Sequence, residues 1–294
     1  MPELLLSELK SEKKDLLQTL ILLEEYIFQG RDMTKVNDVD IQYVDIKDVD
    51  IQGVDIQLTE QSLDALALII EQCQAVISEI ESPLDQAEVL LNELFYQHLF
   101  IDKQVSDWPV KAFKVASSLN QRLMSPIVKA AMVCEVIGAC GFDCDLVFVP
   151  TKVMVRLCCN DDYAIIFDAI SGESLDWHEL DLCLDDIEGD PSQYELDSMK
   201  RPAILVEYLS ALKNALIREK LFDKALVCVD VLLSLNPDDP YQRRDRGFLL
   251  HQLDCFKVAV DDYRYFVDQC PTDPAAILLK IQLDNITLKD PVFH

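Results

Sequence analysis

The sequence lacks a long apolar run and has few basic residues for its length. No stretch of its 294 residues approaches 18 consecutive apolar residues, so we expect no transmembrane helix. Its first residues show neither the basic segment nor the apolar core of a signal peptide. Lys and Arg number 26 against 53 Asp and Glu, which gives a formal net charge of −27. This charge repels phosphate backbones and anionic lipids, so we expect neither nucleic acid nor a membrane as partner.

The sequence also lacks the ligand spacing of a metal site, although it contains ten cysteines. Most of them lie in apolar runs such as AAMVC and ALVCV, which is typical of small buried residues in a reducing compartment. We therefore expect a cytoplasmic protein. Cys158 and Cys159 would point to opposite faces of a strand, and no paired His or Cys accompanies them. We expect no metal and no cofactor.

Helices are predicted for much of the first hundred residues. Residues 3–29 have the apolar periodicity of an amphipathic helix, and two further helices are predicted before residue 98, separated at Pro83. Residues 39–58 instead repeat the pentapeptides VDIQY, VDIKD, VDIQG and VDIQL, whose period matches neither a helix nor a strand. We interpret residues 1–58 as an N-terminal helix followed by an acidic insertion. Cation binding by its aspartates is the weaker alternative, because they lack the spacing of a calcium loop.

A mixed α+β core is predicted for residues 59–198. The nearly all-apolar run IVKAAMVCEVIGAC follows Ser125 and Pro126 and predicts a buried helix that Gly141 ends. Three segments rich in β-branched and aromatic residues come next, CDLVFV, KVMVRLCC and YAIIFDA, and short turns separate them. Consecutive strands joined by short turns predict an antiparallel sheet packed against helices. Before this core, residues 102–114 are polar and predict a loop.

Residues 199–294 carry a second repeat with a longer period. Three residue pairs are 34 positions apart: Phe222 and Phe256, Ala225 and Ala259, and Pro237 and Pro271. A period of this length is the signature of the tetratricopeptide repeat, a pair of antiparallel helices. Gly247 stands where that repeat needs a small residue, whereas the first unit has Lys213 there. We therefore predict an all-α segment of two tetratricopeptide repeats.

Taken in order, these segments resemble the SirB family of bacterial transglutaminase-like proteins with C-terminal tetratricopeptide repeats. The matching stretches are LDALA (63–67), LNELF (91–95), SPIVKAAMVCEVIGACGF (125–142), VPTKVMVRL (149–157), IFDAISGE (166–173) and PDDPYQRRDRG (237–247). The resemblance implies a transglutaminase-like (papain-like) α+β domain followed by an all-α repeat segment. It also implies a regulatory role, linked in some members to virulence-gene expression. The pentapeptide insertion and residues 100–117 depart from the family pattern.

The resemblance also implies where a catalytic site would stand. Such domains place a Cys nucleophile at a helix start, a His base on the second strand and an acid on the third. The corresponding positions here are Ser125, Lys152 and Asp168. A protonated lysine cannot accept a thiol proton as a histidine does, and Asp168 also suits the start of a turn. The nearest cysteine, Cys134, is expected to be buried inside the helix and inert.

We therefore predict a catalytically vacant pseudoenzyme that acts as a protein-interaction or regulatory module, with a protein partner bound through the repeats. The candidate partner-binding residues are Arg243, Arg244 and Arg246, because guanidinium groups bind carboxylates through paired hydrogen bonds. The other interpretation of these arginines is intramolecular pairing with the acidic segment 176–197. The alternative function is that of a cysteine hydrolase or acyl transferase with a rearranged site.

Overall fold

The computed structural model describes residue 9 and residues 15–29, 54–98, 105–149, 152–160, 162–176, 178–179 and 197–287. The chain divides into two compact units. The core unit comprises Ser11–Ile204, and the repeat unit comprises Met1–Lys10 and Leu205–His294. Within the described residues, no helix is both long enough and apolar enough to cross a membrane.

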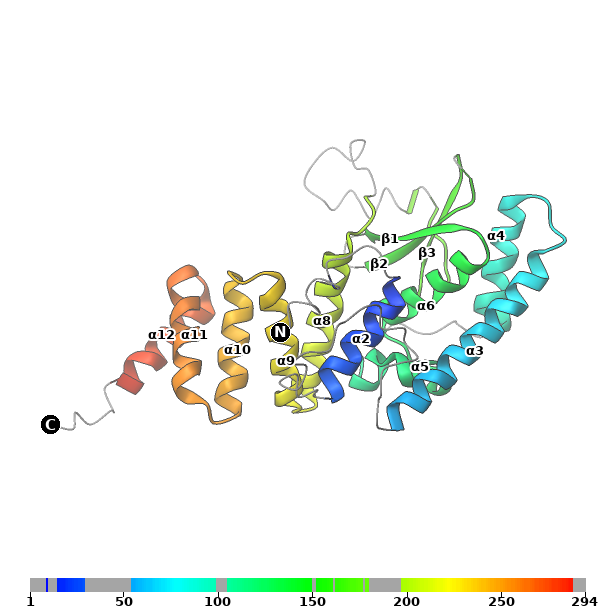
Figure 1. Cartoon of the computed structure of the whole chain (residues 1–294). Helices are drawn as coiled ribbons and strands as arrows, with labels where there is room; N and C mark the ends of the chain where they lie inside the picture. The colour runs from blue at the N-terminus through cyan, green and yellow to red at the C-terminus, as the bar shows by residue number, and fades with distance from the viewer. Residues whose placement is uncertain are drawn as a thin grey trace, which may run out of the picture. The chain divides into compact units, whose positions relative to one another are not determined.

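The core unit contains a three-stranded antiparallel sheet with the strand order β1-β2-β3 (Figure 1). The strands follow one another along the chain: β1 is Asp143–Val149, β2 is Lys152–Cys158 and β3 is Ala164–Asp168. Asp145 of β1 lies opposite Arg156 of β2, and the Arg156 Nε donates a hydrogen bond of 2.9 Å to Asp145 Oδ1. The antiparallel arrangement predicted from the sequence is confirmed.

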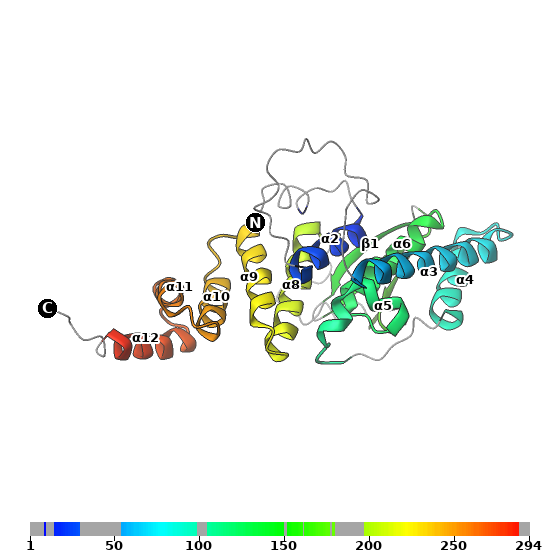
Figure 2. The ribbon, with the colours of Figure 1, turned by 60° about the horizontal axis from the view of Figure 1, so that its bottom comes forward.

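Helix α6, Pro126–Ala139, is the buried helix that the sequence predicts. It contacts β1, β2, α2 and α3, and Figures 1 and 2 both show it beside the strands. Val128, Ala130 and Val133 are each fully buried, as expected for a helix that is apolar on nearly every face. Lys129 is the exception, since it is a charged residue that is only 1% exposed.

The other helices of the core unit pack against α6 or against one another. They are α2 (Leu16–Gln29), α3 (Val54–Ile77), α4 (Pro83–Asn92), η3 (Glu93–Gln97), η4 (Val110–Phe113) and α5 (Val115–Gln121). The last pentapeptide of the repeat, residues 54–58, forms the start of α3, which therefore begins earlier than predicted. The copies at 39–53 lie outside the described residues.

The segment predicted as a polar loop contains a short buried helix, so that prediction is partly wrong. In η4 the apolar residues Val110, Ala112 and Phe113 are 5%, 0% and 3% exposed. The carbonyl of Ala112 accepts a hydrogen bond of 2.7 Å from the N–H of Ser125, which ties this turn to the start of α6. Three apolar residues are enough to anchor one turn. The prediction missed them because polar residues dominate the composition of the segment as a whole.

The described part of the repeat unit is helical. Its helices are α8 (Arg201–Arg218, whose first turn belongs to the core unit), α9 (Phe222–Leu235), α10 (Pro240–Gln252), α11 (Phe256–Gln269) and α12 (Pro274–Thr287). Figure 1 shows α9, α10 and α11 side by side. A Cβ added at Gly247 would lie 2.8 Å from the Tyr263 ring and 3.1 Å from the Ala259 carbonyl. The small residue predicted at this helix crossing is therefore required by close packing.

Candidate functional site

Ser125 stands at the start of α6, where the resemblance places the nucleophile. Pro126 occupies the first turn and Ser125 the N-cap, but the Ser125 side chain makes no capping hydrogen bond. The residue is 1% exposed, and its Oγ is buried without a hydrogen-bond partner among the described residues. A nucleophilic hydroxyl needs a base within hydrogen-bond reach. Among the described residues, no base lies within hydrogen-bond distance of the Ser125 hydroxyl.

Lys152 and Asp168 are brought together from neighbouring strands. Asp168 lies opposite Met154 in the register of β2 and β3, so Lys152 lies opposite the turn that follows β3. The Lys152 Nζ is 3.8 Å from Asp168 Oδ2. The lysine side chain is 49% exposed and the aspartate side chain 10% exposed. Water therefore screens the lysine side of this pair.

The carboxylate of Asp168 also shapes the turn after β3. Its Oδ1 accepts a hydrogen bond of 2.7 Å from the Ile170 N–H, and its backbone carbonyl accepts one of 2.8 Å from the Gly172 N–H. Gly172 has a φ of +74°, and a Cβ there would lie 2.6 Å from the Phe95 ring, so the turn requires glycine. The interpretation of Asp168 as a turn-forming residue is confirmed.

Lys129 belongs to the same region, and the sequence analysis did not single it out. It lies one turn into α6, and its buried Nζ donates a hydrogen bond of 3.0 Å to the Ile170 carbonyl. The turn after β3 is thus held by Asp168 from within and by Lys129 from α6. A signal was present, because Lys129 is the one cation in a nearly apolar helical run and a buried charge needs polar partners.

The three predicted positions therefore form no triad. Lys152 and Asp168 pair with each other, while the Ser125 hydroxyl bonds to neither of them within the described chain. Proton transfer from a nucleophile needs a base with a pKa near the working pH. The described residues place no histidine at these positions. Among the described residues, no group of three or more His, Cys, Asp and Glu side chains is arranged to hold a metal ion.

Cys134 of α6 lies near β1, where the Cys144 thiol donates a hydrogen bond of 3.5 Å to the Cys134 carbonyl. A hydrogen bond with the Cys144 thiol, and then burial, raises the pKa of Cys134 well above its ordinary value. Both cysteines line a cavity of about 760 Å³ together with Asp15, Glu135 and Arg201. Cys134 is only partly buried, so the expectation of full burial is wrong. Its raised pKa makes it a poor nucleophile.

The arginines of α10 form the second candidate site. Arg246 binds Asp262 of α11 through two hydrogen bonds of 2.7 Å, from Nε to Oδ2 and from Nη2 to Oδ1. Asp262 is 2% exposed, and hydrogen bonding to it raises the pKa of the Arg246 guanidinium. Arg243 Nη1 adds a contact of 3.4 Å to the same carboxylate. This bidentate pair joins α10 to α11 from a buried position.

Arg244 has different surroundings. Its Nε and Nη2 donate hydrogen bonds of 3.0 and 2.8 Å to Asp245 Oδ1. Asp245 also accepts a hydrogen bond of 2.6 Å from Lys213 of α8, which is 4% exposed. The Arg244 guanidinium lies 5.5 Å from the centre of the Tyr241 ring and 5.4 Å from that of Phe266. Arg244 therefore combines a shared carboxylate with two aromatic contacts.

The described partners of these arginines are aspartates of the repeat unit itself. They are Asp245, Asp262 and, 3.9 Å from Arg246 Nη1, Asp230. The acidic segment 176–197, predicted as an intramolecular partner, lies largely outside the described residues. Among the described residues, these contacts join four cations, Lys213 and the three arginines, to three aspartates.

Comparison with known proteins matches two successive segments of the chain to two protein families. Residues 59–214 match a family model described as transglutaminase-like superfamily, and residues 212–284 match one described as tetratricopeptide repeat. The chain is 30% identical over 226 residues to a UPF0162 protein of Vibrio cholerae, covering 76% of this chain and 83% of that one. It is 31% identical over 244 residues to the UPF0162 protein YchA of Escherichia coli K12, covering 79% and 87%. It is 29% identical over 242 residues to the protein SirB1 of Salmonella typhimurium, covering 80% and 89%.

Proposed function

Because the chain belongs to the family of SirB1 and YchA, in which a transglutaminase-like domain continues into tetratricopeptide repeats, we propose that it binds a partner protein and performs no catalysis. The family assignment made from short sequence stretches is correct. The observation that carries the functional proposal is the chemistry of Ser125, Lys152 and Asp168, the three residues that the sequence resemblance assigns to catalytic positions.

Each of these positions is unsuited to acyl transfer. The hydroxyl of Ser125 is buried, so a substrate carbonyl cannot approach it without a local rearrangement. The Lys152 Nζ lies 3.8 Å from Asp168 Oδ2, and no contact joins it to the Ser125 hydroxyl among the described residues. One oxygen of Asp168 is engaged by the Ile170 N–H and the other lies nearest Lys152. No imidazole is available at these positions to move a proton between nucleophile and leaving group.

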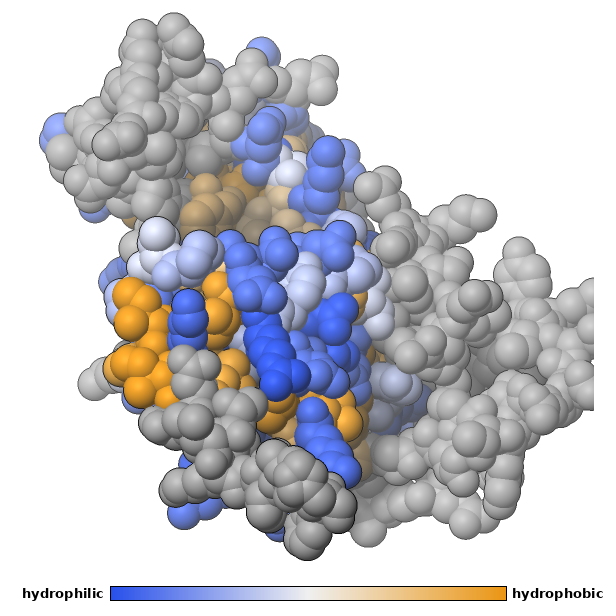
Figure 3. Space-filling view, turned by 90° about the vertical axis from the view of Figure 1, so that its left-hand side faces the viewer, coloured by the Kyte–Doolittle hydropathy of each residue, from blue (hydrophilic) through white to orange (hydrophobic). Residues whose placement is uncertain are grey.

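The repeat unit presents an apolar surface that suits a partner protein. On α10, Tyr241 and Phe248 are 47% and 39% exposed, and on α12 the exposed apolar residues are Ile277, Leu278 and Ile281. Figure 3 shows apolar side chains gathered beside polar ones at the end of the molecule that carries α11 and α12. Repeat proteins use such extended surfaces to bind other proteins, and an exposed apolar patch rimmed by polar groups marks an interaction site.

The arginine cluster supplies the polar part of this surface. Arg244 is one-third exposed, and its carboxylate partner Asp245 is also bound by Lys213. Because two cations share one carboxylate, Arg244 keeps the capacity to bind a second carboxylate. We infer that the partner offers an acidic residue together with apolar side chains, with Arg244 as the main anchor and Arg243 and Arg246 beside it.

A capture experiment tests this proposal. The wild-type chain immobilised in a native lysate should retain one stoichiometric partner, and Arg244→Ala should lose it. Arg264→Ala is the matched control, because Arg264 lies on α11 with a side chain 55% exposed and a weak contact to Asp261. The control should retain the partner. Recovery of no stoichiometric partner, or equal loss in both variants, would count against the proposal.

A separate experiment tests the absence of catalysis. A fluorophosphonate probe labels serines that a base has activated, and we expect it to leave Ser125 unlabelled at neutral pH. Labelling of Ser125 that is lost in Ser125→Ala would contradict the proposal and favour a hydrolase or acyl transferase. The labelled position is identified by peptide mass spectrometry.

A further inference from the structure

Strand β3 forms one edge of the sheet, and its backbone groups divide between two sides. Cys159 N–H donates a hydrogen bond of 2.8 Å to the Tyr163 carbonyl, so residues 163, 165 and 167 direct their backbone groups toward β2. The backbone groups of Ala164, Ile166 and Asp168 therefore point away from the sheet. These outward groups can pair with a further strand.

The chain that returns from the turn pairs with only part of this edge. Asp168 N–H donates to the Glu173 carbonyl at 3.0 Å, and Leu175 N–H donates to the Ile166 carbonyl at 2.9 Å. Within the described chain, no backbone hydrogen bond engages the outward N–H of Ile166 or either backbone group of Ala164. Ala164 is exposed and Ile166 is partly exposed, so this stretch of edge is open to solvent.

The pairing stops because the chain begins a helical turn at Asp176. Glu179 N–H donates to Asp176 Oδ1 at 2.7 Å, and Asp176 N–H donates to Glu179 Oε2 at 3.0 Å. This reciprocal pair is a capping box, which fixes the start of a helix. Asp176 therefore ends the strand-like pairing two residues after Ser174, the bridge partner of Phe167, and its carboxylate stays beside the open edge.

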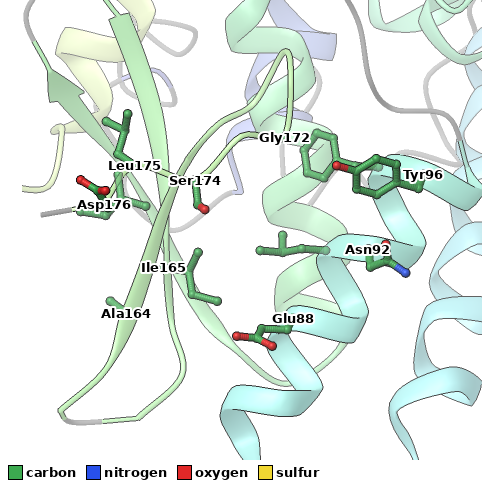
Figure 4. Close-up of a pocket in the computed structure, with 12 residues that line it drawn as sticks. Glu88, Asn92, Tyr96, Ala164, Ile165, Gly172, Ser174, Leu175 and Asp176 are labelled. Carbon is green, nitrogen blue, oxygen red and sulfur yellow. The ribbon is translucent and has the colours of Figure 1, made fainter. Parts of the chain in front are cut away.

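A cavity of about 430 Å³ lies between the open edge and helices α4 and η3 (Figure 4). Leu91 and Ile165 supply apolar surface from the two sides, and Figure 4 shows Glu88 projecting from its helix toward the strand. The 12 lining residues include two carboxylates, Glu88 and Asp176, and no Lys, Arg or His. The groove thus combines unpaired backbone groups with an apolar floor and negative charge.

We propose that this groove binds an extended basic peptide segment, which adds to β3 as a further strand and directs Lys or Arg side chains to Glu88 and Asp176. Strand addition supplies partners for the open N–H and C=O groups, and alternate side chains of the added strand reach the floor and the carboxylates. A strand from a second copy is disfavoured, because each copy carries a charge of −27. This site lies on the core unit and is independent of the partner site proposed for the repeats.

The binding test uses the full chain and a capped, fluorescein-labelled peptide of eight alternating Lys and Val residues. We expect saturable binding in fluorescence anisotropy at physiological salt. The same peptide with N-methylated backbone amides keeps its charge but cannot donate to the edge, so it should bind about tenfold more weakly or worse. Equal binding of both peptides would show that only net charge attracts them, and would overturn strand addition.

Two variants place the peptide in the groove. Glu88→Gln should weaken binding about two- to fivefold through loss of one exposed ion pair, whereas Glu71→Gln, an exposed position on α3 outside the cavity, should leave it unchanged. Ala164→Pro removes an outward N–H at the first residue of an edge strand, where proline is tolerated, and should weaken binding further. Circular dichroism checks that Ala164→Pro is folded. If it is not, the comparison of Glu88→Gln with Glu71→Gln decides whether the peptide binds in the groove. Equal effects of both glutamate variants would overturn the site.

Two controls separate this proposal from its neighbours. In sedimentation experiments the wild-type chain should form no dimer through the β3 edge. A dimer that dissociates in Ala164→Pro would show that a second copy occupies this edge, and would overturn the proposal of a bound peptide. Arg244→Ala should bind the labelled peptide as the wild type does. Loss of peptide binding in Arg244→Ala would show that the peptide binds to the repeat unit, and would also overturn the proposal.

Discussion

The ammonium group of Lys152 lies 3.8 Å from the carboxylate of Asp168, beside the turn that follows β3. The two partners are unequal. Asp168 is nearly buried and also accepts the Ile170 N–H, while the lysine side chain is half in water. The structural importance of this region therefore rests on the aspartate.

Asp168→Ala is expected to lower the free energy of unfolding by about 1–3 kcal/mol, because it leaves the buried Ile170 N–H without its acceptor. Lys152→Ala removes only an exposed partner and should cost less than about 1 kcal/mol. Urea denaturation followed by circular dichroism measures both values. Equal losses in the two variants would mean that the ion pair, rather than the turn, holds this region together.

Local chemistry explains which parts of this region the sequence could predict. The turn role of Asp168 follows from the run IFDAISGE, since an aspartate bonds to the backbone two residues later. The meeting of Lys152 and Asp168 follows from the antiparallel register of two consecutive strands. The lone charge of Lys129 in an apolar run signals a need for a polar partner, but the identity of that partner could not be predicted, because the acceptor lies 41 residues away.

The arginine cluster shows the same limit in another form. Spacing predicts that α10 carries Arg243, Arg244 and Arg246, but not which carboxylates they meet. With 53 acidic residues in the chain, many partners compete on charge alone. The close crossing of α10 and α11 at Gly247 brings Asp262 under Arg246. Partner choice is thus decided by backbone packing, which an unaligned sequence does not display.

Asp262→Ala should be among the most damaging changes in the repeat unit. It leaves the guanidinium of Arg246, partly buried, without its bidentate acceptor, and removal of one partner of such a pair costs about 3–5 kcal/mol. Asp261→Ala is the adjacent control, with a side chain 80% exposed, and should change stability by less than about 0.5 kcal/mol. Thermal and urea unfolding measure both values. Similar losses of unfolding free energy in the two variants would show that the Asp262 ion pair does not stabilise the repeat unit.

Glu135 predicts a pH dependence of stability. Burial, and then the charge of Asp15, raises the pKa of Glu135 in the folded chain. The folded state then binds this proton more tightly than the unfolded state, so stability falls as the pH rises from the unfolded value of about 4.3 through the folded value. Glu135→Gln should therefore be more stable than the wild type at pH 7.5, by about 0.5–1 kcal/mol.

The pH series distinguishes this effect from a change in packing. The advantage of Glu135→Gln should shrink as the pH falls toward the raised pKa of the folded state, because the wild-type carboxyl then takes up its proton. Glu71→Gln, at an exposed position on α3, is the matched control and should show no such trend. An advantage that stays constant with pH would assign the effect to side-chain shape.

Thiol reactivity provides a test of the alternative function as a cysteine enzyme. Burial, with smaller contributions from Cys140 and Glu93, raises the pKa of Cys73 to about 12, so only about one thiol in ten thousand is ionised at pH 8. Burial also raises the pKa of Cys228, whereas Cys255 is exposed. Limiting iodoacetamide at pH 8 should therefore label Cys255 before either buried thiol, as read by peptide mass spectrometry.

An activated nucleophile would reverse this order. A cysteine enzyme built on α6 and β1 would need Cys134 or Cys144 to react faster than the exposed Cys255, because a catalytic thiolate forms at neutral pH. The raised pKa of Cys134 predicts the opposite order. Labelling of Cys255→Ser gives the decisive comparison, since fast modification of Cys134 in that variant would contradict the non-catalytic proposal. Slow modification there, together with uniform labelling in urea, would show that folding alone protects this thiol.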